Sequence, residues 1–170
     1  MKSPPNVTNR MKLTQQDIDL YSPYLKECFP EANLSKVRVY SCRAVKIPYY
    51  LYNRCCKQKC KMGDLVAGFA LGNRVFISEP YPTTKPSAFT KHLLLHELTH
   101  CCQFQKLGYW KFFKRHSREL RTHGFAGMYV TPGTLEYEAE EVARNIRRAS
   151  KPLTNNRAEF SALIGRLAGT

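Results

Sequence analysis

The sequence predicts an α+β domain in which a small, antiparallel-containing sheet is followed by a helical C-terminal part. Two β-prone runs flank a Gly72-Asn73 pair, which favours a tight hairpin. The helical segments lie mostly after the strands rather than alternating with them, which is typical of segregated α+β architecture. The chain has 170 residues, of which 43% are hydrophobic and 12% aromatic, enough for one packed core.

The N-terminal residues are expected to differ from the rest of the chain. Residues 1–13 contain Pro4-Pro5 and few apolar side chains, so we expect a flexible arm followed by a single domain over residues 14–170. Thr14 and Asp17 have the spacing of a capping box. They predict a helix that continues to about residue 29 and bends at its internal proline.

Strands are predicted from apolar runs and their alternation. The stretch "VRVYSC" alternates as a half-buried strand does. The stretch "VKIPYYLYN" contains a proline and is expected to be an edge strand or a loop. Strands are therefore expected over residues 37–42, 65–71 and 74–78.

Four helices are predicted after the hairpin. Ser87 is a suitable N-cap for the first and Gly108 a suitable stop. Thr134 can cap the third, and Asn156 with Glu159 resembles a capping box for the last. The expected ranges are 88–107, 110–121, 135–150 and 156–167, with a loop over 125–133.

The formal net charge of +14 predicts attraction to acidic partners, whether nucleic acid, anionic membrane or acidic protein. No nucleic-acid-binding motif is visible, so specific nucleic-acid recognition is not expected. No apolar run has the roughly 20 residues that span a bilayer, and the N-terminus lacks the apolar core of a secretory signal. We expect a cytoplasmic location or secretion without a cleaved signal, including delivery into a target cell.

The seven cysteines are an odd number and include two adjacent pairs, which favours reduced thiols over a disulfide framework. Cys55, Cys56 and Cys60 lack the spacing of common zinc ribbons. We expect them to be loop residues rather than zinc ligands or reactive thiols.

The stretch "HELTH" predicts a zinc site on the long helix. Positions four apart point the same way, so His96 and His100 present two imidazoles to one point. Glu97 is turned by about 100° around the helix and can reach a metal-bound water without becoming a ligand. This H-E-x-x-H arrangement uses the glutamate as general base. Cys101 and Cys102 turn away from His100, so at least one of them is expected to pack in the core.

A catalytic zinc needs a third protein ligand. The remaining histidines do not have the spacing of a known third ligand; they are His92, His116 and His123. A carboxylate fits better, and Glu136, which lies 36 residues beyond His100, is the preferred candidate, with Glu138 as the alternative. Glu140 lies one turn after Glu136, where it could accept a hydrogen bond from a ligating imidazole.

"HELTHCCQF" followed by "LEYEAEEVA" resembles the gluzincin type of zinc metallopeptidase. More narrowly, it is similar to small bacterial zincin-like domains with an HELxHxxQ motif and a later ExEA-like helix. The resemblance covers roughly residues 66–148 and implies a zincin-like fold with bound Zn²⁺, Glu97 as base and Glu140 in support of a ligand. In these families an aspartate usually stands where this chain has Glu140. The ligands that the resemblance implies are His96, His100 and Glu136.

The resemblance implies a metalloendopeptidase that acts on a protein or peptide, with an acidic substrate hinted at by the charge, and a role as an effector or toxin. His123 and Tyr129 are then candidate oxyanion donors, and strand 74–78 a candidate edge for an extended peptide. Two alternatives stay open. The chain could be a catalytically idle zincin-fold module that binds acidic partners, or a nucleic-acid-associated basic protein with a coincidental motif.

Overall fold

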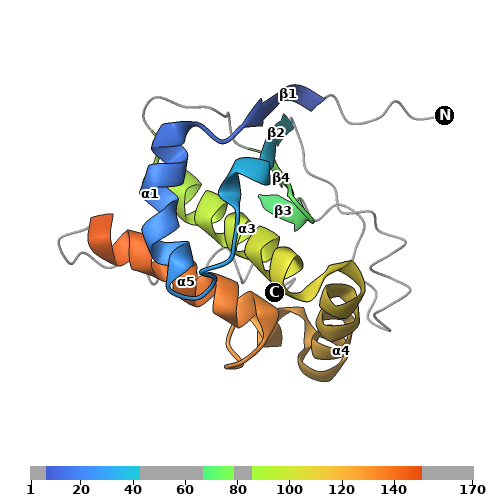
Figure 1. Cartoon of the computed structure of the whole chain (residues 1–170). Coiled ribbons are helices and arrows are strands. Elements are labelled where there is room, and N and C mark those ends of the chain that lie inside the picture. Colours follow the sequence, from blue (N-terminus) through green and yellow to red (C-terminus); the bar gives the residue numbers. More distant parts are fainter. Residues whose placement is uncertain (1–6, 43–66, 79–85, 151–170) are drawn as a thin grey trace.

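A computed structural model describes residues 7–42, 67–78 and 86–150. These residues form an α+β fold with a four-stranded mixed sheet and four α-helices (Figure 1), so the predicted class is confirmed at that level. The predicted helix over residues 156–167 and the "VKIPYYLYN" segment lie outside the described residues.

The sheet has the strand order β1-β2-β4-β3, which places β4 inside it and β3 at an edge. β4 runs parallel to β2 and antiparallel to β3. The expectation that strand 74–78 presents a free edge is therefore wrong, because β2 and β3 occupy both of its edges. The strands are β1 (Val7–Lys12), β2 (Arg38–Cys42), β3 (Gly68–Leu71) and β4 (Arg74–Ile77).

β1 differs from the flexible arm expected for residues 1–13, because residues 7–12 pair antiparallel with β2. Backbone pairing requires only a few apolar contacts on one face. Met11 packs against the core, and the buried Leu13 follows directly after the strand. These two side chains explain how a largely polar segment becomes part of the sheet.

The predicted hairpin is confirmed. Gly72 and Asn73 join β3 to β4, and Gly72 has a φ of 62°, a backbone conformation that favours glycine. A Cβ atom at this position would also overlap the hydroxyl group of Tyr109. The positive φ of Gly72 and the contact with Tyr109 both require glycine here, and the contact places the hairpin turn against the helix that begins at Tyr109.

Side-chain caps set the helix starts as the sequence indicates. Both hydrogen bonds of the Thr14–Asp17 capping box are present, and the Ser87 hydroxyl accepts from the Thr90 backbone N–H. Thr134 Oγ1 accepts from the backbone N–H of Tyr137 at 3.2 Å. The helices are α1 (Gln15–Lys26), α3 (Ala88–Leu107), α4 (Tyr109–Met128) and α5 (Leu135–Ser150). In the described part of the chain, none of them combines the length and the apolar character needed to cross a bilayer.

Two helix ends differ from expectation. α1 ends at Lys26, before the predicted end near residue 29. α4 continues past residue 121 and is broken at Gly124, where φ is 69°, before a further helical turn over residues 125–128. The glycine thus interrupts the helix without starting the loop that was expected there, and the chain turns toward α5 only after Met128.

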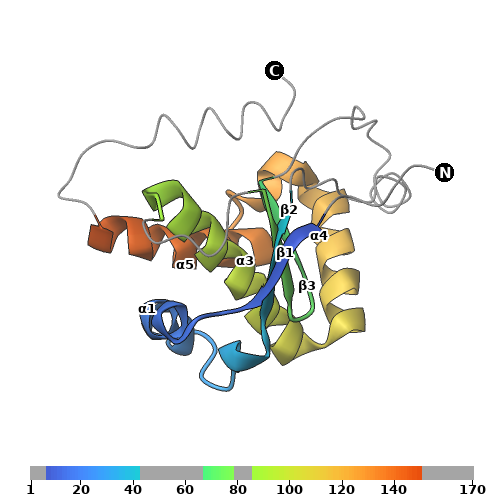
Figure 2. The same cartoon turned by 90° about the horizontal axis from the view of Figure 1, so that it is seen from above.

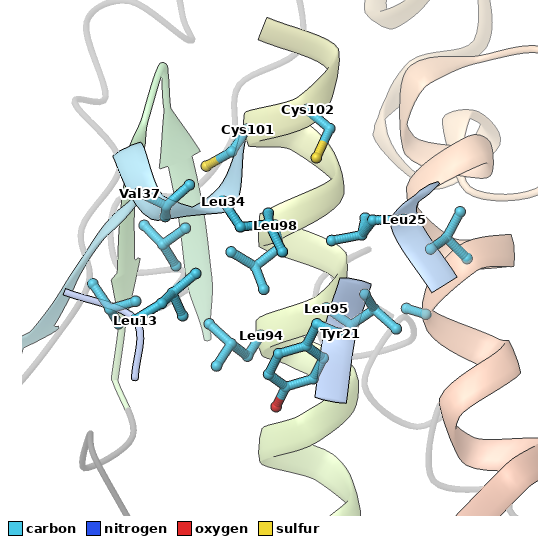
Figure 3. Packing of buried hydrophobic residues seen from close by; sticks show 14 of the residues in the cluster. Leu13, Tyr21, Leu25, Leu34, Val37, Leu94, Leu95, Leu98, Cys101 and Cys102 are labelled. Atoms are coloured by element: carbon cyan, nitrogen blue, oxygen red, sulfur yellow. The ribbon is translucent and has the colours of Figure 1, made fainter. Parts of the chain in front are cut away.

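α3 is the central element of the fold. It lies between the sheet on one side and α5 on the other, as both views show (Figures 1 and 2), and α1 also contacts it. The side chains of Leu94, Leu95 and Leu98 fill the space between these layers (Figure 3). A helix buried on most sides holds its polar residues in fixed positions, which is the condition for a buried site.

We expect Thr14→Ala to lower the free energy of unfolding by about 1 kcal/mol, the usual effect of losing a side-chain N-cap. Denaturant unfolding measures this difference. Gln16→Ala, at an exposed position in the same helix, is the control and should leave stability nearly unchanged. Equal stability of the two variants would contradict the role of the capping box.

Candidate metal centre

Three buried side chains bring one ligand atom each to a common point, and the group could hold a metal ion. His96 Nε2 and His100 Nε2 are 3.2 Å apart. Glu136 Oε2 lies 3.2 Å from the first and 3.3 Å from the second. All three residues are 6–7% exposed. These are the residues that the sequence indicates as ligands, and α3 and α5 bring them together.

The edges of this triangle fit one tetrahedral cation. Ligand bonds of about 2.0–2.1 Å at tetrahedral angles place neighbouring donor atoms about 3.3 Å apart. The observed separations of 3.2 to 3.3 Å match that value. Two imidazoles and one carboxylate are also a donor set that zinc accepts while keeping a fourth position open.

The start of α5, which carries Glu136, is held in place by α4. Glu119 Oε2 accepts the backbone N–H of Leu135 at 2.9 Å. Arg115 holds Glu119 with a bond of 2.7 Å and also donates to the Gly133 carbonyl at 2.7 Å. Side chains of α4 therefore bond the backbone at the N-terminus of α5 and fix the position of Glu136 relative to α3.

Gln103 sets the tautomer of His100. The Gln103 amide nitrogen donates to the Leu135 carbonyl at 3.0 Å, so its Oε1 must be the atom that faces His100 Nδ1 at 2.8 Å. An acceptor at Nδ1 requires the proton on that nitrogen. In the neutral imidazole the Nε2 lone pair of His100 is then directed toward the ligand triangle, as a metal ligand requires.

Glu140 faces two imidazoles of α3. Its Oε2 lies 3.1 Å from His92 Nε2 and 3.7 Å from His96 Nδ1. The closer partner is thus His92, and not the ligating imidazole that the sequence suggests. Arg144 donates to the other carboxylate oxygen at 3.1 Å, and His92 Nδ1 lies 3.1 Å from the Ala143 carbonyl. Glu140 therefore connects α5 to α3 through His92 and places its negative charge behind the His96 ring.

The outer oxygen of Glu136 also has partners. His116 Nε2, from α4, lies 3.1 Å from Glu136 Oε1. Tyr129 stacks on the His96 ring with centroids 5.9 Å apart and hydrogen bonds to Glu136. Burial, followed by the negative charge of Glu136, holds the pKa of Tyr129 well above its usual range, so its hydroxyl stays protonated.

The charges of the triangle are strongly coupled. Burial by itself lowers the pKa of His100, but the Glu136 carboxylate outweighs it and raises that pKa to about 9. Burial would raise the pKa of Glu136, yet His100 and the hydrogen bonds from His116 and His96 hold it well below its usual range. Glu136 is consequently a carboxylate at neutral pH, the form that binds a cation.

Glu97 has an unusual environment. It is 4% exposed, and its Oε2 is the one buried side-chain oxygen or nitrogen in the described residues that has no hydrogen-bond partner. Burial raises the pKa of Glu97, and the ligand triangle is close enough to act on its charge. On the sheet side, a Cβ atom built on Gly68 would lie 3.1 Å from Glu97 Oε1. A side chain at this position would therefore press on the Glu97 carboxylate.

The other predicted candidates lie outside the triangle. Glu138, the alternative third ligand, is partly exposed and pairs with Arg115 at 3.1 Å. His123 is exposed on α4, so of the two proposed oxyanion donors only Tyr129 lies beside the ligands. Cys101 and Cys102 are both buried in the core, where burial raises the pKa of Cys102 to about 12. Cys55, Cys56 and Cys60 are outside the described residues.

Sequence reasoning assigns no role to three residues that the structure places around the site. His92 precedes His96 by four residues, so the repeat of His92, His96 and His100 on one helix face was a usable signal. Gln103 lies one turn after His100 and could have been recognised by the same argument. His116 had no such signal, because its position depends on how α4 packs against α3 and α5.

Comparison of the chain with protein-family models, with curated proteins and with solved structures finds no match. The function is therefore inferred from the geometry of the site.

Proposed function

We propose that the protein is a zinc-dependent metallopeptidase of the gluzincin type, with a zincin-like fold. Three protein ligands with one open position are the usual arrangement of a catalytic zinc, whereas structural zinc sites have four protein ligands. His96, His100 and Glu136 supply such a set. When bound, the metal would act as a Lewis acid that polarises a carbonyl group and lowers the pKa of water.

The observation that carries this proposal is the state of Glu97. A buried carboxylate oxygen without a hydrogen-bond partner is costly, so its position calls for a functional explanation. Glu97 follows the first ligand directly and shares its helix, it is not one of the three ligands, and its Oε1 lies on the side of Gly68 in β3. In that position it can accept a proton from a water molecule and later donate it to the amine that leaves.

Other residues orient the reacting groups. Tyr129 keeps its hydroxyl proton and lies against the His96 ring; by turning this O–H away from Glu136 it can donate a hydrogen bond to a carbonyl oxygen that gains negative charge. His116 holds the outer oxygen of Glu136 and prevents that carboxylate from rotating. Gln103 fixes the His100 ring at Nδ1, opposite the ligand triangle, and the Glu140 carboxylate lies 3.7 Å from Nδ1 of His96.

The position of β3 supports a binding site for the substrate backbone. β3 pairs only with β4 among the described strands, and Gly68 brings its backbone next to Glu97. We propose that an extended peptide adds to the edge of β3, with the scissile bond between Glu97 and the ligand triangle. Among the described strands, β3 thus has the edge position that was expected for strand 74–78.

Metal content and peptide cleavage test the proposal together. The purified protein should contain about one zinc per chain by elemental analysis after dialysis against a buffered zinc solution. Cleavage of a peptide library, read by mass spectrometry, should stop on chelation and return with added zinc. A protein that binds zinc tightly yet cleaves neither the library nor any protein of a cell lysate would contradict the enzymatic part.

We expect Gly68→Ala to lower the rate of cleavage without removing the metal. The new methyl group would lie 3.1 Å from both Glu97 Oε1 and the Phe76 carbonyl oxygen, so Glu97 must move by a few tenths of an ångström. A displacement of this size in a general base reduces the rate roughly tenfold or more. Gly127→Ala on α4 is the control, since its nearest neighbour is His123 Cβ at 3.2 Å. Unchanged cleavage by Gly68→Ala would contradict the placement of β3.

A further inference from the structure

The β3–β4 hairpin meets the junction of α3 and α4 (Figure 2). Residues of these elements and of β2 line a second concave site, separate from the ligand triangle. This groove has a volume of about 470 Å³, which is within the range of small-molecule sites. Ten described residues line it, and three of them are cationic while none is acidic. None of the ten belongs to the ligand triangle. The cationic residues are Lys36, Arg38 and Arg74.

The cations are placed against one another. Arg38 of β2 is in register with Arg74 of β4 on one side and with Lys12 of β1 on the other. Like charges directly opposite in a sheet are unfavourable. In the described part of the chain, no carboxylate forms an ion pair with Arg38 or Arg74. The sheet therefore holds a row of positive charge that a bound anion would neutralise.

Hydrogen bonds to backbone carbonyls fix the guanidinium group of Arg38 in an orientation that suits an anion. Its Nη1 donates to the Ser35 carbonyl at 3.1 Å and to the Val37 carbonyl at 3.0 Å. These bonds fix the plane of the guanidinium and leave its other N–H groups for a ligand. Planar, fixed guanidinium groups are suited to phosphate and carboxylate, which they bind through two parallel hydrogen bonds.

The walls of the groove include aromatic rings. Tyr109 is 50% exposed, and its hydroxyl end rests against Gly72, so the ring stands as a fixed wall. Its other neighbour is Phe104, with ring centroids 5.1 Å apart. On the sheet side, the Tyr40 ring is fixed by stacking on Phe76 at 4.8 Å. A fixed, half-exposed ring beside two arginines fits a ligand that has both negative charge and a flat ring.

We propose that this groove binds nucleotide phosphate, with the phosphate on Arg38 and Arg74 and the base on the Tyr109 ring. The ligand is either a free nucleotide or a unit of a single-stranded nucleic acid, since both offer the same chemistry. An acidic peptide would satisfy the arginines equally but gives no reason for the aromatic wall. The assignment does not depend on the metal centre or on peptidase activity.

Binding to the full-length protein tests the assignment. The probe is a short, fluorescently labelled single-stranded oligonucleotide, followed by anisotropy at several salt concentrations, with a nucleoside diphosphate as competitor. Arg38→Gln combined with Arg74→Gln should weaken binding about a hundredfold, or about tenfold for each arginine. The slope of log K against log salt should decrease in magnitude by about 1.4, the value for two phosphate contacts on a single strand.

The matched control removes the same charge elsewhere. Arg118→Gln combined with Arg121→Gln lies on the exposed surface of α4, outside the groove, and should weaken binding only slightly. Equal weakening by both pairs would overturn the assignment, because it would show that only net charge matters. The single variant Arg74→Gln tests whether weaker binding comes from misfolding. Loss of the Arg74 charge removes its repulsion with Arg38, so the melting temperature of the variant should not fall, while binding should weaken about tenfold.

Two further arms identify the ligand. Competition by the nucleoside diphosphate at concentrations similar to the oligonucleotide supports a free nucleotide as ligand, and competition only at far higher concentrations supports a strand. An oligoglutamate peptide of equal charge that displaces the probe as well as unlabelled oligonucleotide would overturn the assignment in favour of an acidic protein. Absence of measurable binding at low salt would also overturn it. Glu136→Gln should bind the probe like the parent, which separates this site from the metal centre.

Discussion

Glu97→Gln is expected to keep one zinc per chain and to lower the rate of peptide cleavage by about 10²–10⁴-fold, the usual contribution of a general base. The amide has nearly the shape of the carboxylate but cannot accept a proton at neutral pH. Because Glu97 is not among the three ligands, the metal content should not change. Cleavage of a fluorogenic peptide, with zinc measured on the same sample, gives both results.

The stability of this variant provides an independent check. Burial disfavours the charged form of Glu97, and its Oε2 has no hydrogen-bond partner. Replacing the carboxylate by a neutral amide should therefore leave the melting temperature equal or higher. Glu31→Gln, at an exposed position between α1 and β2, is the control and should have parental activity. If Glu97→Gln cleaved as fast as the parent, the proposed mechanism would be wrong.

Glu136→Gln is expected to weaken zinc binding by more than about 100-fold, since losing a residue that only orients a ligand already costs 10–100-fold. The variant loses the negative charge that two imidazoles face, at 3.2 and 3.3 Å. Competition with a chromophoric chelator measures the affinity. Activity should fall in parallel and should recover in part at high zinc concentration, because the two histidines remain.

Glu138→Gln is a closely matched control for this experiment. Glu138 lies two residues away on the same helix, but its carboxylate pairs with Arg115 and Gln103 on a partly exposed surface. Its replacement should leave zinc affinity within a few-fold of the parent. The reverse result, with Glu138 essential and Glu136 dispensable, would overturn the ligand assignment.

The two histidine ligands could be predicted because they depend on local geometry, whereas Glu136 comes beside them only through the packing of α5 on α3. His96 and His100 are neighbours on a helix face wherever that helix packs, and the capping signals at Ser87 and Thr134 are equally local. The Gly72-Asn73 hairpin is local too. These features needed only the period of a helix or the conformation of one glycine.

Features that depend on long-range packing could not be read in this way. The pairing of β1 with β2 joins a polar segment to a strand that follows more than 25 residues later, and no alternation of apolar residues in that segment predicts it. The parallel pairing of β2 with β4 makes β4 internal, although a hairpin strand is usually free at its outer edge. His116 reaches Glu136 only because α4 packs against α5. In each case the tertiary arrangement, and not local preference, decides the outcome.

The tie between Gln103 and the Leu135 carbonyl also has a consequence for the order of events during folding. The same side chain that orients His100 joins α3 to the first turn of α5, across 32 residues of sequence. An unfolded chain therefore holds neither the imidazole orientation nor the carboxylate in place, and zinc can be taken up tightly only after α5 has docked. The rate of zinc uptake by refolding protein should therefore equal the rate at which α5 docks on α3, and not the faster rate at which the helices form. Zinc binding would then report the last step of assembly and stabilise its product.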